Sequence, residues 1–157
     1  MSASPDQAIS PRGDYIPVAA WGHADFNGFD WKCVDNIGGA ADCFNNCFWD
    51  PRNNNRNAAR FFTYNGNDRK CCCKIPAQSP AGSNSILLVQ GWGEMVGYDF
   101  PNKFDVYSEQ TSFESCRSNV NYGVNVYRKD INGGTCFYKT PDDVPGRPDV
   151  ITGYGKF

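Results

Sequence analysis

The chain has 157 residues, a formal net charge of -2 and 15% aromatic residues. This length suits one ordinary domain or two small ones, and so small a charge gives no basic field for nucleic acid or acidic lipid. The longest apolar stretch, Ile86 to Val89, is far too short to cross a bilayer. We therefore expect neither a nucleic-acid partner nor a membrane span.

The chain begins with a segment, residues 1–15, that we expect to be flexible. It contains Arg12-Gly13-Asp14, the tripeptide that integrins recognise, but so short a motif is far more often part of a neutral tail. Met1 to Pro17 lacks the basic and apolar runs of a signal peptide, so we expect an exported protein of this sequence to be a mature form.

Cysteine is the most informative residue type in the rest of the chain. The eight cysteines are Cys33, Cys43, Cys47, Cys71, Cys72, Cys73, Cys116 and Cys136. An even number in a short chain favours disulfide bonds and an oxidising compartment, because cytosolic reductants would keep the thiols free. The sequence therefore predicts a secreted or cell-surface protein.

A helix is predicted over 42–50. Asp42 is a good N-cap residue type, and Cys43 and Cys47 recur at the i and i+4 spacing of one helix face. Pro51 and the asparagines after it end the helix and begin a loop. Short segments rich in aromatic and β-branched residues predict antiparallel strands at 60–64, 69–75, 86–92, 124–128 and 135–139.

The same features occur twice in the same order. Each copy has Asp-Phe followed by Phe-Asp, a helix cysteine, an aromatic or apolar strand, a strand that begins with cysteine and a closing Gly-aromatic-Gly. The matched segments are 25–30 with 99–105, 41–47 with 114–120, 61–64 with 124–127, 71–76 with 136–141 and 91–93 with 153–155. This order indicates an internal duplication. We predict an α+β fold of two tandem modules, 16–93 and 94–157, each a small antiparallel sheet with one helix.

The repeat also predicts the disulfide pairing. Cys43 and Cys47 lie roughly 6 Å apart along a helix axis, and Cys71 and Cys73 lie about 6.6 Å apart on one face of a strand, so the two pairs can be bridged together. The only two cysteines of the second copy align with Cys43 and Cys71. The predicted bonds are Cys43 with Cys71, Cys116 with Cys136, Cys47 with Cys73 and, by elimination, Cys33 with Cys72.

These residues resemble the PAN/apple modules. Ala41 to Cys47 is similar to the family's helix with CxxxC spacing, and Phe61 to Tyr64 looks like its Phe-x-Tyr strand. Its Cys-x-x-Lys strand is matched twice, at 71–74 and 136–139. The resemblance implies a twisted antiparallel sheet clasped by one helix, with disulfides between them. It also implies a non-catalytic extracellular recognition module that binds a carbohydrate or a protein.

The sequence does not favour catalysis. The single histidine, His23, is not repeated in the second copy, which favours a structural or surface role. Four repeated carboxylates more often tie strand ends than cleave glycosides: Asp25, Asp30, Asp99 and Asp105. A zinc site is disfavoured because the second copy keeps one cysteine pair, Cys116 and Cys136, which cannot supply four ligands. We predict no enzyme activity, no metal and no cofactor.

Binding by aromatic surfaces fits the composition better. Aromatic faces beside Asp and Asn suit saccharide rings and protein partners, and the candidates are Trp21, Trp31, Trp49, Trp92, Tyr98, Tyr107, Tyr122 and Tyr154. We expect specificity where the copies differ, around 53–57 and 119–122. The predicted ligand-binding residues are Asn54, Arg56, Asn119, Asn121 and Tyr122 from these segments, together with the aromatic Trp49. The alternatives are a structural subunit of a cell-surface coat or filament and a secreted effector or inhibitor of a host protein. A small disulfide-linked hydrolase comes last.

Overall fold

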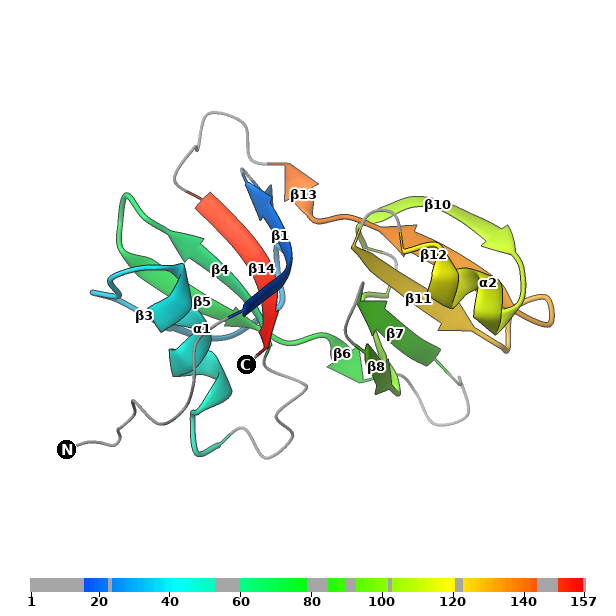
Figure 1. The fold of residues 1–157 in the computed structure, drawn as a ribbon, viewed down its shortest axis with the longest axis horizontal. Coiled ribbons are helices and arrows are strands. Elements are labelled where there is room, and N and C mark those ends of the chain that lie inside the picture. The colour runs from blue at the N-terminus through cyan, green and yellow to red at the C-terminus, as the bar shows by residue number, and fades with distance from the viewer. Residues whose placement is uncertain are drawn as a thin grey trace.

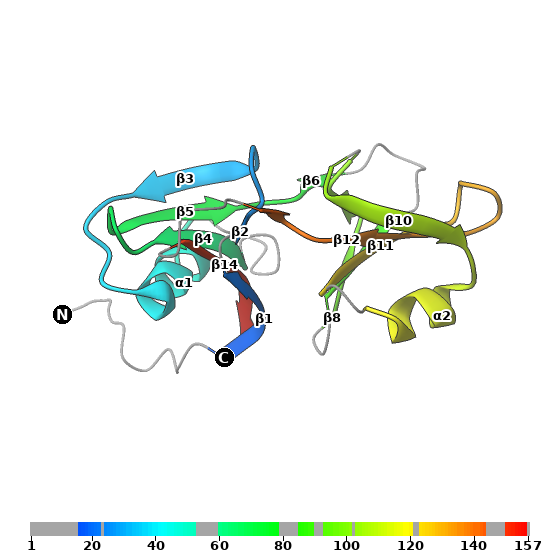
Figure 2. The same cartoon turned by 90° about the horizontal axis from the view of Figure 1, so that it is seen from above.

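The computed structural model describes residues 16–22, 24–52, 60–78, 85–89, 93–101, 103–120, 123–143 and 150–156. Within these ranges the chain is rich in sheet and has two helices and four disulfide bonds. Two five-stranded antiparallel sheets lie side by side, one with helix α1 and the other with helix α2 (Figure 1, Figure 2).

The first sheet combines strands from both ends of the chain. Its strands, in spatial order, are β1 (Ile16–Gly22), β14 (Val150–Lys156), β4 (Phe61–Asn65), β5 (Lys70–Lys74) and β3 (Asp30–Val34). The last strand of the chain, β14, lies between β1 and β4 and pairs with both. Figure 1 shows this red strand beside the dark blue β1.

The second sheet has the same plan. Its strands, in spatial order, are β10 (Asp105–Gln110), β12 (Thr135–Lys139), β11 (Val124–Arg128), β7 (Ser85–Val89) and β8 (Gly93–Val96). The outer strand of each sheet is shifted in register at the same place, between Asp30 and Lys32 in β3 and between Asp105 and Tyr107 in β10. A bulge of this kind bends and twists the strand that carries it.

The two sheets do not follow a linear division of the sequence. The predicted modules 16–93 and 94–157 are contiguous, whereas β7 pairs in the second sheet and β14 pairs in the first. Two short ladders cross between the halves in the same way: β13 (Asp142–Asp143) pairs with β2 (Ala24–Asp25), and β6 (Ala77–Gln78) pairs with β9 (Tyr98–Asp99). The division at residue 93 therefore stays a prediction about the repeated sequence, and each half completes the sheet of the other.

Each helix packs against its sheet through cysteine. Helix α1 (Ala40–Phe48) begins two residues earlier than predicted, and its N-cap is Gly39 rather than Asp42. The Asp42 carboxylate instead lies in the first turn, where the helix dipole favours negative charge. Helix α2 (Phe113–Ser118) is shorter, and the Ser112 side chain caps it by accepting a hydrogen bond from the Ser115 amide.

The predicted strands agree with the structure to within about two residues where it describes them. Strands 124–128 and 135–139 have the predicted bounds, and 61–65, 70–74 and 85–89 lie close to theirs. The remaining strands of the two sheets, β1, β3, β8, β10 and β14, were not predicted. Their sequences lack a clear alternation of apolar and polar residues, and three of them contain glycine.

The repeated phenylalanines form the core between the sheets. Phe26 stacks on its repeat partner Phe100, with ring centroids 4.8 Å apart and an interplanar angle of 6°. Phe104 and Phe61 meet the Phe26 ring edge-on, at 5.2 Å each. All four side chains are buried, and they join one cluster with Leu87 and Val126 of the second sheet. Burial of each phenylalanine contributes about 1.5–3 kcal/mol.

Candidate functional site

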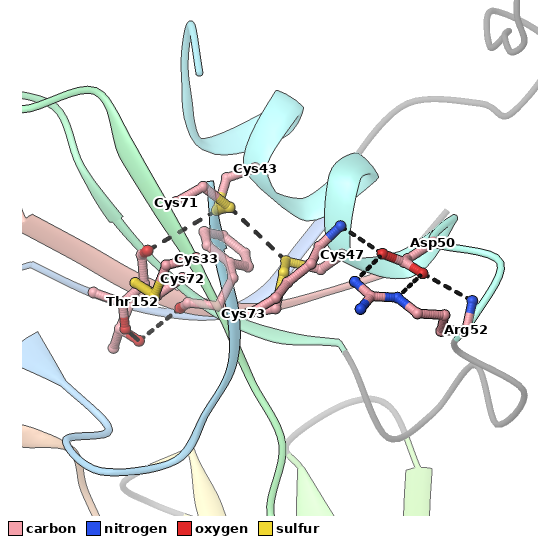
Figure 3. Close-up of a disulfide and its surroundings, with 12 residues drawn as sticks. Cys33, Cys43, Cys47, Asp50, Arg52, Cys71, Cys72, Cys73 and Thr152 are labelled. Atoms are coloured by element: carbon pink, nitrogen blue, oxygen red, sulfur yellow. Dashed lines mark hydrogen bonds and ion pairs between the residues drawn. A yellow bond between two sulfur atoms is a disulfide. The ribbon is translucent and has the colours of Figure 1, made fainter. Parts of the chain in front are cut away.

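The four disulfide bonds have the predicted pairing. Two of them, Cys43–Cys71 and Cys47–Cys73, tie α1 to β5, while Cys116–Cys136 ties α2 to β12 and Cys33–Cys72 joins β3 to β5. Figure 3 shows the first two between helix and sheet, with the Cys47 and Cys71 sulfur atoms 3.8 Å apart. Cys33–Cys72 lies apart from both in this view.

Two groups of side chains lie close enough together to share a metal ion. One group is Cys43, Cys47 and Cys71, and the other is Asp30, Cys33 and Cys72. All five cysteines are in disulfide bonds, whereas a cysteine that binds a metal does so as a thiolate. The disulfide-bonded chain therefore offers no thiolate in either group.

The repeated carboxylates hold two buried lysines. The ammonium of Lys74 lies 3.0 Å from Asp25 and 2.5 Å from Asp30, and its side chain is 3% exposed. In the second half the ammonium of Lys139, which is 2% exposed, lies 2.7 Å from Asp105 and 3.9 Å from Asp99. A buried ammonium needs such partners, because an unpaired buried charge is very costly. The carboxylates thus tie the strand ends, as the sequence predicts.

Lys139 has further partners that link its strand to the phenylalanine core. Its ammonium donates hydrogen bonds to the carbonyl oxygens of Phe100, at 2.8 Å, and Lys103, at 2.9 Å. Burial raises the pKa of the neighbouring Asp99 carboxyl, and the charge of Lys139 opposes this effect. The Cys-x-x-Lys strand therefore fixes the turn that carries Phe100 and Phe104.

A cluster of charged side chains, the Asp50 cluster, lies at the end of α1 in the first half. It consists of Trp31, Lys32, Asp50 and Arg52. The buried Asp50 carboxylate accepts hydrogen bonds from Lys32 at 2.6 Å and from two nitrogens of the Arg52 guanidinium at 3.0 and 3.1 Å (Figure 3). The guanidinium and ammonium groups lie 5.1 and 5.7 Å from the centre of the Trp31 ring. Cation–π attraction therefore adds to the ion pairs.

The electrostatics of the Asp50 cluster favour the ionised carboxylate. Hydrogen bonds from Arg52, and after them those from Lys32, hold the pKa of the Asp50 carboxyl well below its usual range, although burial opposes them. The positive charges of Lys32 and Arg52 are thus paired with the negative charge of Asp50 within the cluster. The arrangement joins β3 to the segment after α1.

The equivalent place in the second half is aromatic and holds the exposed Tyr107. Lys32 is the register partner of Cys73, and Tyr107 is the register partner of Tyr138 after the same bulge. The Tyr107 ring stacks on the buried Tyr138 ring with centroids 4.4 Å apart and an interplanar angle of 19°. Tyr107 itself is 44% exposed. We call Tyr107, Tyr138 and Glu109 the tyrosine platform.

Glu109 completes the tyrosine platform. Its Oε2 accepts a hydrogen bond of 2.6 Å from the Tyr138 hydroxyl. Burial, together with this hydrogen bond, raises the pKa of Tyr138, so the phenol stays protonated and remains a donor. The stacked pair is thereby held in one orientation, and an exposed carboxylate lies beside the exposed tyrosine. Helix α2 has six residues against the nine of α1, which is consistent with the more exposed outer strand.

The predicted ligand-binding residues do not come together in the described part of the chain. The half-buried Trp49 packs edge-on against Phe48, with ring centroids 4.9 Å apart. The Asn119 side chain donates a 2.9 Å hydrogen bond to the Ser115 carbonyl at the end of α2. Both side chains thus serve the ends of different helices. The other predictions lie outside the described residues: Asn54, Arg56, Asn121 and Tyr122, together with His23 and the Arg12-Gly13-Asp14 tripeptide.

Of the eight candidate aromatics, Tyr107 is the one that the structure leaves most exposed among those whose side chains it describes. Trp31, Trp49 and Tyr98 are half-buried, and nothing is described for the side chains of Trp21, Trp92, Tyr122 and Tyr154. Sequence analysis missed Glu109, although its place two residues after Tyr107 puts both on one face of a strand. A predicted strand at 105–110 would have shown the pair.

Comparisons with protein-family models, with curated protein sequences and with solved structures found no match.

Proposed function

We propose that the protein is a non-catalytic extracellular recognition module that binds a carbohydrate or a protein. The tyrosine platform carries this proposal. Its Tyr107 is 44% exposed and lies on the outer strand β10, all six residues of which are exposed. No other aromatic side chain that the structure describes is as exposed as Tyr107.

The platform suits a ligand with one apolar face and hydroxyl groups. An aromatic ring provides a flat apolar surface, and a nearby carboxylate accepts hydrogen bonds from hydroxyl or amide groups. Tyr138 and Glu109 already hold the parts in place, so binding costs less conformational entropy than it would for loose side chains. A pyranose ring and an extended peptide both satisfy these requirements.

The extracellular part of the proposal rests on the disulfides. Four disulfide bonds persist in an oxidising environment and not in a reducing cytosol. No helix in the described ranges has the length and apolar character to cross a membrane. We propose that the protein is secreted or displayed at a cell surface.

We also propose that the chain is a tandem of PAN/apple-like modules. In support, each sheet has an outer strand with a register shift, β3 or β10, next to a strand that a disulfide ties to a helix. Each sheet also has one buried lysine paired with two carboxylates. These features recur at equivalent places in the two halves. The chain differs from a simple tandem arrangement in two strands: β7 of the first half pairs in the second sheet, and β14 of the second half pairs in the first sheet.

The alternative function, a subunit of a surface coat or filament, is favoured by one observation. Val106 and Tyr107 on β10 are 43% and 44% exposed, and among the described strands β10 pairs with β12 alone. An open strand edge with apolar side chains can pair with another chain. Assembly of copies through β10 would use the same residues as ligand binding. An experiment must therefore distinguish the two functions directly.

A saccharide array run beside light scattering separates these functions. Concentration-dependent signal from a monomer supports carbohydrate recognition, and spontaneous growth to high mass without sugar supports assembly. A stable monomer that binds no saccharide contradicts both of these and leaves a protein partner, which pull-down with extracellular proteins of known sequence can identify. Val96→Ser, on the opposite edge of the same sheet, is the matched control for variants of Tyr107 because Val96 is also exposed.

A further inference from the structure

One disulfide differs from the other three in its exposure to solvent. Cys33 is exposed and Cys72 is half-buried. The six other cysteines have no exposed surface. A thiolate must reach a sulfur atom along the line of the disulfide bond, so a buried disulfide reacts only after the protein opens locally. Exposure therefore distinguishes Cys33–Cys72 chemically.

The position of this bond in the sheet explains its exposure. Cys33 and Cys72 are direct register partners on the antiparallel strands β3 and β5. Alternation along β5 places Cys72 on the face opposite Cys71 and Cys73, whose bonds lie beneath α1. In Figure 3 the Cys33–Cys72 bond accordingly lies away from the helix. Helix α1 therefore does not cover this bond.

The second sheet has no equivalent bond. The corresponding positions in β10 and β12 are Ser108 and Phe137, which are register partners. Strand β3 lies at one edge of its sheet and, among the described strands, pairs with β5 alone. The Cys33–Cys72 bond is thus a covalent lock on one outer strand, and it is separate from the two bonds that hold α1.

We propose that Cys33–Cys72 is the site at which this protein undergoes thiol–disulfide exchange with an external dithiol. A thiolate of the dithiol attacks one sulfur, which forms a mixed disulfide and releases the other cysteine as a thiolate that takes up a proton. The second thiol of the reagent loses its proton and then displaces the bound cysteine, which also becomes a thiol. The reagent leaves as its cyclic disulfide, and the protein gains two electrons and two protons.

Reduction of Cys33–Cys72 should also affect the Asp50 cluster, because both involve strand β3. Strand β3 carries Trp31 and Lys32, which contact Asp50 and Arg52 in the segment after α1. Without this bond, β3 is held by backbone pairing that a register shift already interrupts, by the Asp30–Lys74 ion pair at its first residue and by the Lys32–Asp50 ion pair. The reduced protein therefore keeps α1 on its sheet, while β3 and the Asp50 cluster loosen. This inference does not depend on the ligand of the tyrosine platform.

Native-state reduction of the whole chain by dithiothreitol, followed by alkylation and mass spectrometry, tests the proposal. Cys33 and Cys72 should be alkylated at least about tenfold faster than the other six cysteines, since a tenfold ratio corresponds to only about 1.4 kcal/mol of local opening. Equal rates, or an earlier reaction at any buried pair, would overturn the assignment.

Hydrogen exchange on the same samples measures the structural consequence. Amides of β3 should exchange faster after reduction, while those of β10, which has no lock, should stay unchanged as an internal control. The double variant Cys33→Ser with Cys72→Ser should reproduce the reduced pattern without any reductant. If the variant and the reduced protein protect β3 as well as the oxidised protein does, the bond is not a lock.

Discussion

Replacement of Lys139 by methionine gives the sharpest test of the fold. Its buried ammonium bonds to Asp105 at 2.7 Å and to the carbonyl oxygens of Phe100 and Lys103 at 2.8 and 2.9 Å. Methionine is similar in length and fills the space, but it cannot donate to these acceptors; the Phe100 carbonyl keeps a hydrogen bond from the Lys103 amide at 3.2 Å. Breaking a buried ion pair costs about 3–5 kcal/mol. We expect the low end, about 3 kcal/mol, because the Asp105 side chain is 41% exposed and can be hydrated.

The measurement is denaturant and thermal unfolding of the oxidised protein near pH 7. For a chain of this size a loss of 3 kcal/mol lowers the Tm by about 6–12 °C. Lys74→Met should have a comparable effect through Asp25 and Asp30. Lys103→Met is the matched control, because its side chain is exposed and its loss should change stability by less than about 0.5 kcal/mol. If Lys139→Met is as stable as this control, the ion-pair account is wrong.

Three further substitutions test other parts of the structure. Asp50→Asn should cost about 1–2 kcal/mol at pH 7; because Arg52 lowers the folded-state pKa of Asp50, this difference should shrink as the pH falls below the ordinary value of 3.8. Cys116→Ser with Cys136→Ser should cost about 3 kcal/mol through loss of the crosslink. Phe26→Ala should cost about 3–5 kcal/mol through the cavity left in the core. Unfolding by denaturant measures all three.

Each of these has an outcome that would contradict it. Asp35→Asn removes the same charge from an exposed carboxylate on the same half, so an equal loss of stability in both variants would point to net charge alone. An unchanged midpoint in the double cysteine variant would mean that α2 needs no covalent tie. A cost for Phe26→Ala below about 1 kcal/mol, which is typical of surface sites, would mean that the stack contributes little.

The disulfides could be predicted from the sequence because the repeat and local geometry agree. Cys43 lies on a helix and its partner Cys71 on a strand, and the spacing of cysteines along each element follows from local geometry. The second copy has only the equivalent pair, Cys116 and Cys136, which removes the alternative pairings. The exchange of β7 and β14 could not be predicted in the same way. Which sheet a strand joins depends on non-local pairing, and the patterns of 85–89 and 150–156 suit either sheet.

The candidate site was predicted only in part. Tyr107 was one of eight aromatic candidates, but its exposure depends on β10 being an outer strand, which is a property of the sheet order. Trp49 was predicted as an aromatic candidate and Asn119 because the copies differ there. The Trp49 side chain packs against Phe48, and the Asn119 side chain caps α2. A residue that differs between the two copies can therefore belong to a helix end that differs, and it need not bind a ligand.

The central claim is that Tyr107 recognises a ligand, and the most direct measurement is the affinity of Tyr107→Ala for the saccharide that binds the wild type best. Circular dichroism should first establish that the variant is folded, which we expect because Tyr107 is 44% exposed. The account predicts at least a tenfold weaker Kd, about 1.4 kcal/mol, with Val96→Ser unchanged. Equal Kd values for the wild type and both variants would contradict it.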